Sequence, residues 1–82
     1  MGDAIKLDHL VRKLEELNTL MRSGKLKHGE YDQRLARLIG ELRDRKLDAE
    51  RPAIAATMDD LVSRGVITQA VRVHMESKLG LA

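Results

Sequence analysis

The side chains that could hold a metal or activate a nucleophile are few and poorly spaced. The three histidines are His9, His28 and His74, and no two of them lie three or four residues apart. That spacing is the one that places two ligands on one face of a helix. The chain has no cysteine, so it offers no thiolate ligand, disulfide or thiol nucleophile. We therefore predict no metal site, no cofactor, no small-molecule ligand and no enzymatic activity.

Adjacent carboxylates also fail to make a catalytic pair. Glu15 and Glu16, like Asp59 and Asp60, are neighbours in sequence, and neighbouring side chains on a helix diverge by about 100°. We interpret Asp59 and Asp60 as favourable charge in the early turns of a helix, near the positive end of its dipole. Two glycines flank two lysines in residues 24–29, but that segment lacks the preceding strand and the spacing of a phosphate-binding loop.

The composition indicates one small domain with an aliphatic core. The chain has 82 residues, and Tyr31 is its one aromatic residue. A core built without aromatic side chains suits helices better than a sheet, and the lack of rings argues against a platform for stacking single-stranded nucleic acid. The formal net charge is +2, with both signs interspersed, which is typical of a solvated surface rather than a duplex-binding face.

The spacing of the leucines predicts the fold class. Apolar residues recur alternately three and four positions apart, as in amphipathic helices, and the breaks fall at glycines and at Pro52. We predict an all-α fold of about four helices, arranged as two helix-turn-helix hairpins that pack as a small bundle, with the first hairpin longer. The N-terminal hairpin covers residues 1–50 with helices at about 4–22 and 28–48, and the C-terminal hairpin covers 51–82 with helices at about 52–64 and 68–79. Asp3 is placed to cap the first helix, and Pro52 suits the first turn of the third.

Both hairpins turn at the same short signature, in which a glycine follows a leucine by four positions and an aliphatic residue follows the glycine by two. The residues with structural roles at the turns and helix ends are Gly24, Leu26, Gly65, Ile67, Thr68 and Gly80. Glycine suits the left-handed position after a helix, Gly80 suits a Schellman ending, and Thr68 suits an N-cap. A shift of 41 positions aligns Gly24 with Gly65. The hairpins are therefore either duplicates or two independent solutions to the same turn.

The first hairpin carries two leucine-rich stripes with heptad-like spacing, which is typical of helices that pack against partners. We predict a protein-interaction or oligomer face formed by Leu10, Leu14, Leu17, Met21, Tyr31, Leu35, Leu38 and Leu42. Small cores without disulfides often gain stability by association, so we expect a protein partner, and in particular a homo-oligomer (a dimer or larger). The alternative is that the same leucines pack against each other inside one monomer.

Several positions in each hairpin match a known helical module. In the first hairpin they are Leu17, Leu20, Gly24, Leu26, Glu30, Tyr31, Arg34, Arg37, Leu38 and Ile39, and in the second they are Met58, Leu61, Gly65, Val66, Ile67, Thr68, Lys78 and Leu79. This pattern resembles the SHOCT (short C-terminal) domain, and the resemblance implies a hairpin that mediates oligomerisation or protein contact. The family combines a threonine cap with a glutamate three residues later, which together form a capping box. Here the first hairpin keeps Glu30 but has Lys27 at the cap, and the second keeps Thr68 but has Val71 in place of the glutamate.

The sequence therefore favours a non-enzymatic protein–protein interaction or oligomerisation module that acts through leucine-rich helical faces. The alternative is a small DNA-binding helix-turn-helix regulator that uses the helix after Thr68, with Gln69 and Arg72 reaching base edges. A third hypothesis is a small regulator that captures one enzyme. No apolar run approaches the ~18 residues that span a bilayer, and no signal-peptide pattern opens the chain. We accordingly expect a cytoplasmic protein with no membrane contact.

Overall fold

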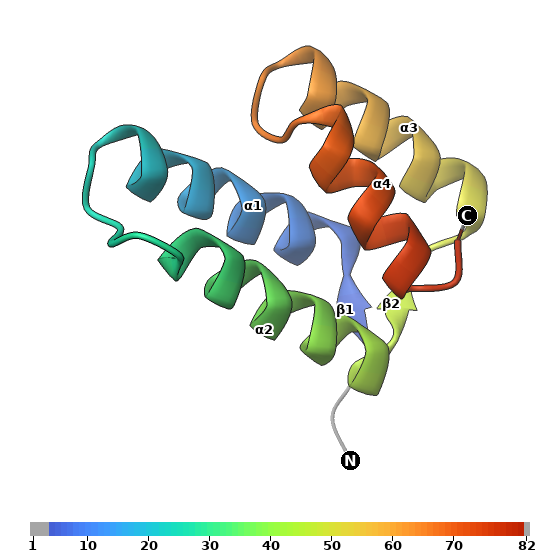
Figure 1. The fold of residues 1–82 in the computed structure, drawn as a ribbon. Helices are drawn as coiled ribbons and strands as arrows, with labels where there is room; N and C mark the ends of the chain where they lie inside the picture. The colour runs from blue at the N-terminus through green and yellow to red at the C-terminus, as the bar shows by residue number, and fades with distance from the viewer. Residues whose placement is uncertain (1–3, 82) are drawn as a thin grey trace.

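A computed structural model describes residues 4–81, and within that range the chain forms two helical hairpins joined by a short pair of strands (Figure 1). The elements are β1 (Ile5–Lys6), α1 (Leu7–Arg22), α2 (Glu30–Arg45), β2 (Leu47–Asp48), α3 (Arg51–Ser63) and α4 (Gln69–Lys78). The predicted all-α class with four helices is confirmed. The first hairpin is the longer one, because its helices have 16 residues each and those of the second have 13 and 10.

The predicted ends of the first two helices need correction. The first helix begins at Leu7 rather than near residue 4, and its N-cap is Lys6, whose side chain makes no capping bond. The predicted cap Asp3 lies outside the described residues. The second helix runs from Glu30 to Arg45 rather than over 28–48. The third and fourth helices lie within one residue of their predicted bounds.

The segment before α1 and the segment after α2 pair with each other as parallel strands, with Ile5 opposite Leu47. Ile5 lies five positions before Leu10, and Leu47 lies five positions after Leu42. On a continuous helix five positions leave a residue about 140° away from the buried stripe, so both side chains would turn away from the core. The extended conformation instead buries Ile5 to 2% exposure. The Ile5 amide also donates a hydrogen bond to the carbonyl of Lys46, at 2.8 Å.

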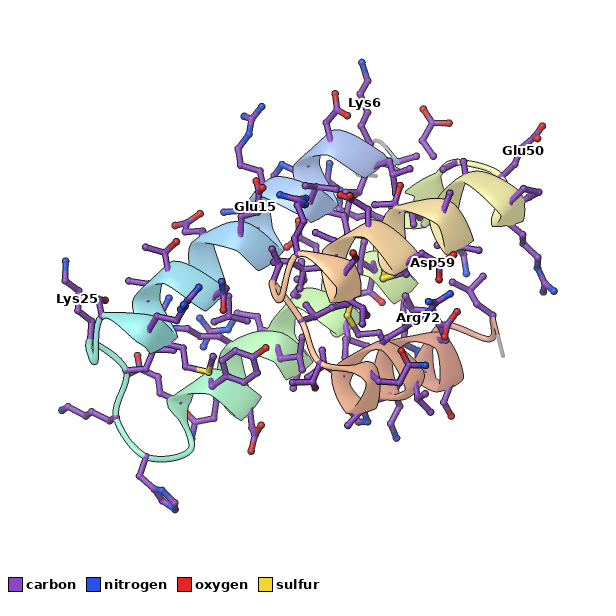
Figure 2. The ribbon with its side chains drawn as sticks, turned by 90° about the horizontal axis from the view of Figure 1, so that it is seen from above. Lys6, Glu15, Lys25, Glu50, Asp59 and Arg72 are labelled. Carbon is purple, nitrogen blue, oxygen red and sulfur yellow. The ribbon has the colours of Figure 1, made fainter. Side chains whose placement is uncertain are left out.

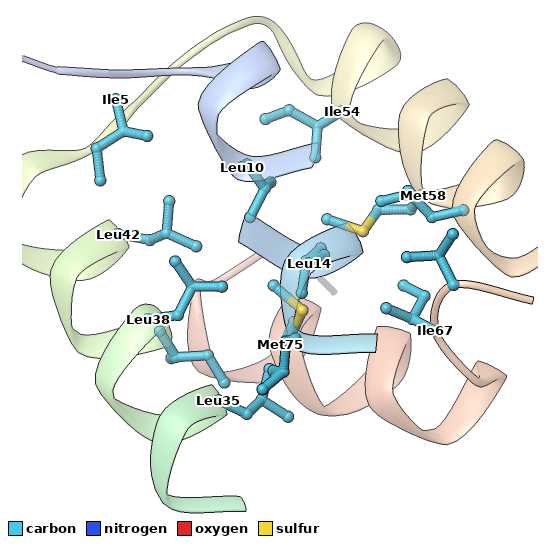
Figure 3. Close-up of a cluster of buried hydrophobic side chains, with 14 residues drawn as sticks. Ile5, Leu10, Leu14, Leu35, Leu38, Leu42, Ile54, Met58, Ile67 and Met75 are labelled. Atoms are coloured by element: carbon cyan, nitrogen blue, oxygen red, sulfur yellow. The ribbon is translucent and has the colours of Figure 1, made fainter. Parts of the chain in front are cut away.

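One hydrophobic core holds both hairpins together. Its buried residues come from β1, from all four helices and from the second turn: Ile5, Leu10, Leu14, Leu17, Leu35, Leu38, Ile39, Leu42, Ile54, Met58, Leu61, Val66, Ile67 and Met75. Leu14 lies between Leu38 of α2 and Met58 of α3, with Met75 of α4 close by (Figure 3). Residues 4–81 contain no buried polar side-chain atom without a hydrogen-bond partner. The two hairpins are therefore halves of one packed unit.

Three helices end in the same hydrogen-bonded motif, as the glycine spacing predicts. Gly24, Gly65 and Gly80 follow α1, α3 and α4 with φ values of 74°, 75° and 74°. In each case the glycine amide donates to the carbonyl three residues earlier, and the next amide donates to the carbonyl five residues before it. This is the Schellman pattern, and its left-handed residue favours glycine. Ile67 is buried just beyond the second turn, whereas Leu26 is only partly buried beyond the first.

Gly40 lies inside α2 and offers a test of these helix energetics. A Cβ added there would meet no atom within 4 Å outside its own helix backbone, and the residue does not have a positive φ. Alanine is a better helix former than glycine, so we expect Gly40→Ala to raise the free energy of unfolding by about 0.5–1 kcal/mol. Urea unfolding followed by circular dichroism measures this. The matched control is Gly24→Ala, which forces alanine to φ 74° and should lower stability; a loss in both variants would contradict this assignment.

Candidate functional site

The predicted interaction face is mostly inside the molecule. Its six leucines are at most 8% exposed, because the stripes of α1 and α2 face each other and the second hairpin. Of the eight predicted residues, Met21 is exposed, at 47%, and Tyr31 is partly buried. Burial, with a smaller contribution from the neighbouring Asp32, raises the pKa of the Tyr31 phenol. The leucine stripes therefore pack within one chain, which is the alternative stated for them.

A groove with a largely apolar lining lies between α2 and α4, and we call it the α2–α4 groove. It has a volume of about 490 Å³ and is lined by Asp32, Leu35, Ala36, Ala70, Val71 and His74. Val73 is 52% exposed and follows Ala70 by three positions, so the two share a face of α4. Only Val73 and Met21 among the large hydrophobic residues of the described chain are classed as exposed. Within residues 4–81, apolar side chains beside α4 are thus left accessible.

The arginine proposed to contact DNA is engaged within the second hairpin. Arg72 donates hydrogen bonds to the carboxylate of Asp59 on α3 and to Glu76 one turn further along α4, the latter at 3.3 Å. Figure 2 shows Arg72 beside Asp59, and the arginine side chain is only 16% exposed. The bond to Asp59 is the main reason that the pKa of Arg72 is raised. Gln69 is exposed at the start of α4. The structure therefore ties Arg72 to two carboxylates.

Arg64, unlike Arg72, connects the two hairpins. Arg64 follows α3 and donates hydrogen bonds of 2.8 Å both to Glu15 on α1 and to Asp60 one turn earlier in α3. These two bonds raise the pKa of Arg64, with Glu15 contributing most. The interpretation of Asp59 and Asp60 as charge in the early turns of a helix is wrong, because they lie near the end of α3. Each instead has an arginine partner.

Each hairpin keeps one half of a capping box, as the sequence indicates. The backbone amide of Lys27 donates to Oε1 of Glu30 at 2.9 Å, and the amide of Val71 donates to Oγ1 of Thr68 at 3.1 Å. Arg34 also donates to the Glu30 carboxylate, at 3.1 Å. Ion pairs between residues four apart join Glu30 with Arg34, Glu41 with Arg45, and Asp60 with Arg64. The caps therefore secure the starts of α2 and α4 by different bonds.

Acid is expected to weaken the start of α2. The bond from the Lys27 amide, followed by that from Arg34, lowers the pKa of Glu30 below its ordinary 4.5. A carboxyl group with a lowered folded pKa stabilises the fold above its unfolded pKa, and this contribution is lost as pH falls through the folded value. Wild type should therefore melt above Glu30→Gln at about pH 6, and the gap should close progressively below about pH 4.5. Thermal melts across this range measure it, and a gap that stays constant in acid would contradict it.

Residues 4–81 contain no cluster of three or more histidine, aspartate or glutamate side chains arranged to hold a metal ion. None of the helices in that range combines the length and the apolar character needed to cross a membrane. Comparison with protein-family models, with curated proteins and with solved structures found no match. The resemblance of the hairpins to the SHOCT domain accordingly stays a prediction from the sequence.

Proposed function

We propose that this chain is a non-enzymatic protein-interaction module that self-associates through the α2–α4 groove. The observation that carries this proposal is the exposure of Val73 beside an apolar groove. Burying a valine side chain of this kind on association contributes favourable free energy of about 25 cal/mol per Å² of apolar surface. The lack of cysteine is compatible with a reducing compartment, and we place the module in the cytoplasm.

A second copy of the chain is the occupant that the groove suits best. In a twofold interface each residue that contacts a partner residue is contacted by its counterpart in return. The α2–α4 groove has a carboxylate, Asp32, on its α2 side and an imidazole, His74, on its α4 side. A twofold arrangement that brings α2 of one copy against α4 of the other can pair these groups twice. A standard interface takes about 800 Å² from each partner, which is a small part of the 5649 Å² accessible surface of this chain.

Sedimentation equilibrium across a concentration series tests the proposal. Wild type is expected to form a dimer at high protein concentration, and Val73→Glu is expected to weaken dimerisation by at least about tenfold, since it places a like charge beside the groove in each copy. Met21→Glu is the matched control, because Met21 is similarly exposed but lies at the end of α1, outside the groove. It should dimerise like wild type.

Two outcomes would overturn this assignment. A wild-type chain that stays monomeric up to hundreds of micromolar, about the range where weak dimers form, would remove self-association. A dimer that Met21→Glu abolishes and Val73→Glu leaves intact would move the interface to the tip of the first hairpin. Circular dichroism spectra must match wild type for both variants, so that a change in mass is not a change in folding.

A further inference from the structure

A second surface, at the opposite end of the bundle from the α1–α2 turn, combines cations with an aliphatic floor. It lies where α2 ends, β2 passes, α3 begins and α4 ends, and its volume is about 680 Å³. We call it the basic pocket. Its floor includes Leu47, Ala49, Leu79 and Leu81, each of which is partly buried and so still accessible. A volume of this size falls within the range of ordinary ligand-binding pockets.

The charge around the basic pocket has one dominant sign. Arg43, Lys46, Arg51 and Lys78 line it, against Asp44 as the one acidic lining residue among those described. Arg51 donates a hydrogen bond of 3.3 Å to the carbonyl of Gly80. No ion pair is formed by Arg43, Lys46 or Lys78 within residues 4–81. This contrasts with Arg34, Arg64 and Arg72, each of which has a carboxylate partner.

The helix ends at this pocket do not account for these cations. The last turn of α2 is closed by the Lys46 amide, which donates to the carbonyl of Leu42 at 3.0 Å. The last turn of α4 is closed by the amides of Leu79 and Leu81, which donate to the carbonyls of Met75 and Glu76. Backbone donors thus satisfy the Leu42 carbonyl of α2 and the Met75 and Glu76 carbonyls of α4, so these carbonyls do not need capping by basic side chains.

The backbone conformation of Lys46, beside the basic pocket, is strained. Lys46 has φ 66° and ψ 152°, and it is the one non-glycine residue with positive φ in residues 4–81. Only glycine adopts this conformation without strain, and such residues persist where the surroundings hold them. The amide of Lys46 bonds to Leu42 and its carbonyl accepts from Ile5. A glycine would relieve the strain but would remove one of the cations around the basic pocket.

We propose that the basic pocket binds an acidic, aliphatic segment of a different protein, whose leucine-like side chains cover the floor while its carboxylates face Arg43, Lys46, Arg51 and Lys78. The cations come from α2, the link to β2, α3 and α4, so they match several carboxylates spread along a segment rather than one headgroup. Nucleic acid fits the pocket less well, because the lining has no aromatic residue for base stacking and a phosphate backbone leaves an aliphatic floor uncovered. This site is separate from the α2–α4 groove and does not depend on self-association.

Fluorescence anisotropy with a labelled peptide of alternating glutamate and leucine pairs tests the proposal, and amide chemical shifts locate the contact. The peptide should bind and shift the amides of Leu47 and Leu79. The double variant Arg43→Glu/Lys78→Glu should weaken binding by about tenfold or more. The matched control is Lys25→Glu/Lys27→Glu, which changes the net charge by the same amount. In Figure 2, Lys25 lies at the other end of the molecule from Glu50, the N-cap of α3. The control should weaken binding by less than about twofold, since screening limits distant charges.

Lys46→Gly supplies a readout that a purely structural role would not give. It should raise the urea midpoint of unfolding because the strained conformation suits glycine, and it should weaken peptide binding about threefold because a cation is lost. Val73→Glu should leave peptide binding unchanged, so that failure of the α2–α4 groove and failure of the basic pocket are distinguished.

Four outcomes would overturn the proposal. They are equal weakening by the two double variants, equal binding of a peptide with lysines in place of the glutamates, no loss of binding in Lys46→Gly, and displacement of the peptide by duplex DNA or by decanoate that shifts the same amides more strongly. The last would make the occupant a nucleic acid or a fatty acid.

Discussion

Leu14→Ala is expected to lower the free energy of unfolding by about 3 kcal/mol, within the 2–5 kcal/mol typical of buried leucine truncations. Leu14 is 1% exposed and belongs to the core cluster shared by all four helices. Removing its branched end leaves a cavity that neighbours from both hairpins cannot fill without moving together. Since a domain of this size has only a modest margin of stability, the variant should be largely unfolded near physiological temperature.

Urea unfolding of wild type and variant at two protein concentrations makes this test specific. If Leu14 belongs to a monomer core, its loss lowers the urea midpoint equally at both concentrations. If it belonged to an oligomer interface, the loss would shrink as the protein is diluted, because dissociation removes the stabilisation that the partner supplies. Met21→Ala is the control on the same helix, because Met21 is 47% exposed and truncation there should cost less than about 0.5 kcal/mol. A concentration-dependent loss for Leu14→Ala would contradict the core assignment.

The leucine stripes show why sequence predicts the helices better than it predicts the function. The spacing of Leu10, Leu14 and Leu17 requires that one helix face be covered, and the structure confirms that it is. The same spacing cannot say whether the cover is another part of the chain or another molecule, because the hydrophobic effect is the same for both. The prediction of an interaction face assumed that another molecule covers these residues. In the structure they are only 0–6% exposed because other parts of the same chain cover them.

The turns were more predictable because their requirements are local. Gly24, Gly65 and Gly80 each occupy the left-handed position after a helix, and that position selects glycine whatever surrounds it. The half capping boxes at Glu30 and Thr68 depend on bonds within three residues. Long-range contacts had no such signal. The bond of Arg64 to Glu15 joins residues 49 apart, and no spacing rule connects them.

At the two candidate binding surfaces, too, the sequence indicates the local features but not the long-range contacts. Val73 could be named from its sequence as an apolar residue on α4, but its exposure depends on how α4 sits against α2. The basic pocket gathers residues from four elements, and Arg43 and Lys78 come together only because β2 turns the chain between the hairpins. The positive φ of Lys46 has no sequence signature, since lysine is not a residue that predicts a left-handed position.

The ends of the two long helices differ from the predicted ones because short strands take their place. The predicted helices included residues 4–6 and 46–48. Ile5 and Leu47 are out of phase with the buried stripes, and in the structure they pair as strands. The five-residue intervals to Leu10 and Leu42 are the signal that could have shown this. If the strand pair is a real part of the core, then Ile5 must contribute as much as a helical core residue.

Ile5→Ala is therefore expected to lower the free energy of unfolding by about 2–4 kcal/mol. Ile5 is 2% exposed, whereas a residue at the frayed start of a helix would tolerate truncation at little cost. Lys6→Ala is the matched control, because the neighbouring side chain is exposed and its loss should change stability by less than about 0.5 kcal/mol. Ile5→Val should fall between them, since it keeps the β-branched shape that suits a strand and removes one methylene. Equal, small losses for Ile5→Ala and Lys6→Ala in urea unfolding would mean that β1 does not hold the hairpins together. A large loss for Ile5→Ala and a small one for Lys6→Ala would instead mean that β1 stabilises the packing of the hairpins. Because the Ile5 amide donates to the Lys46 carbonyl, β1 would then also help to hold Lys46 beside the basic pocket.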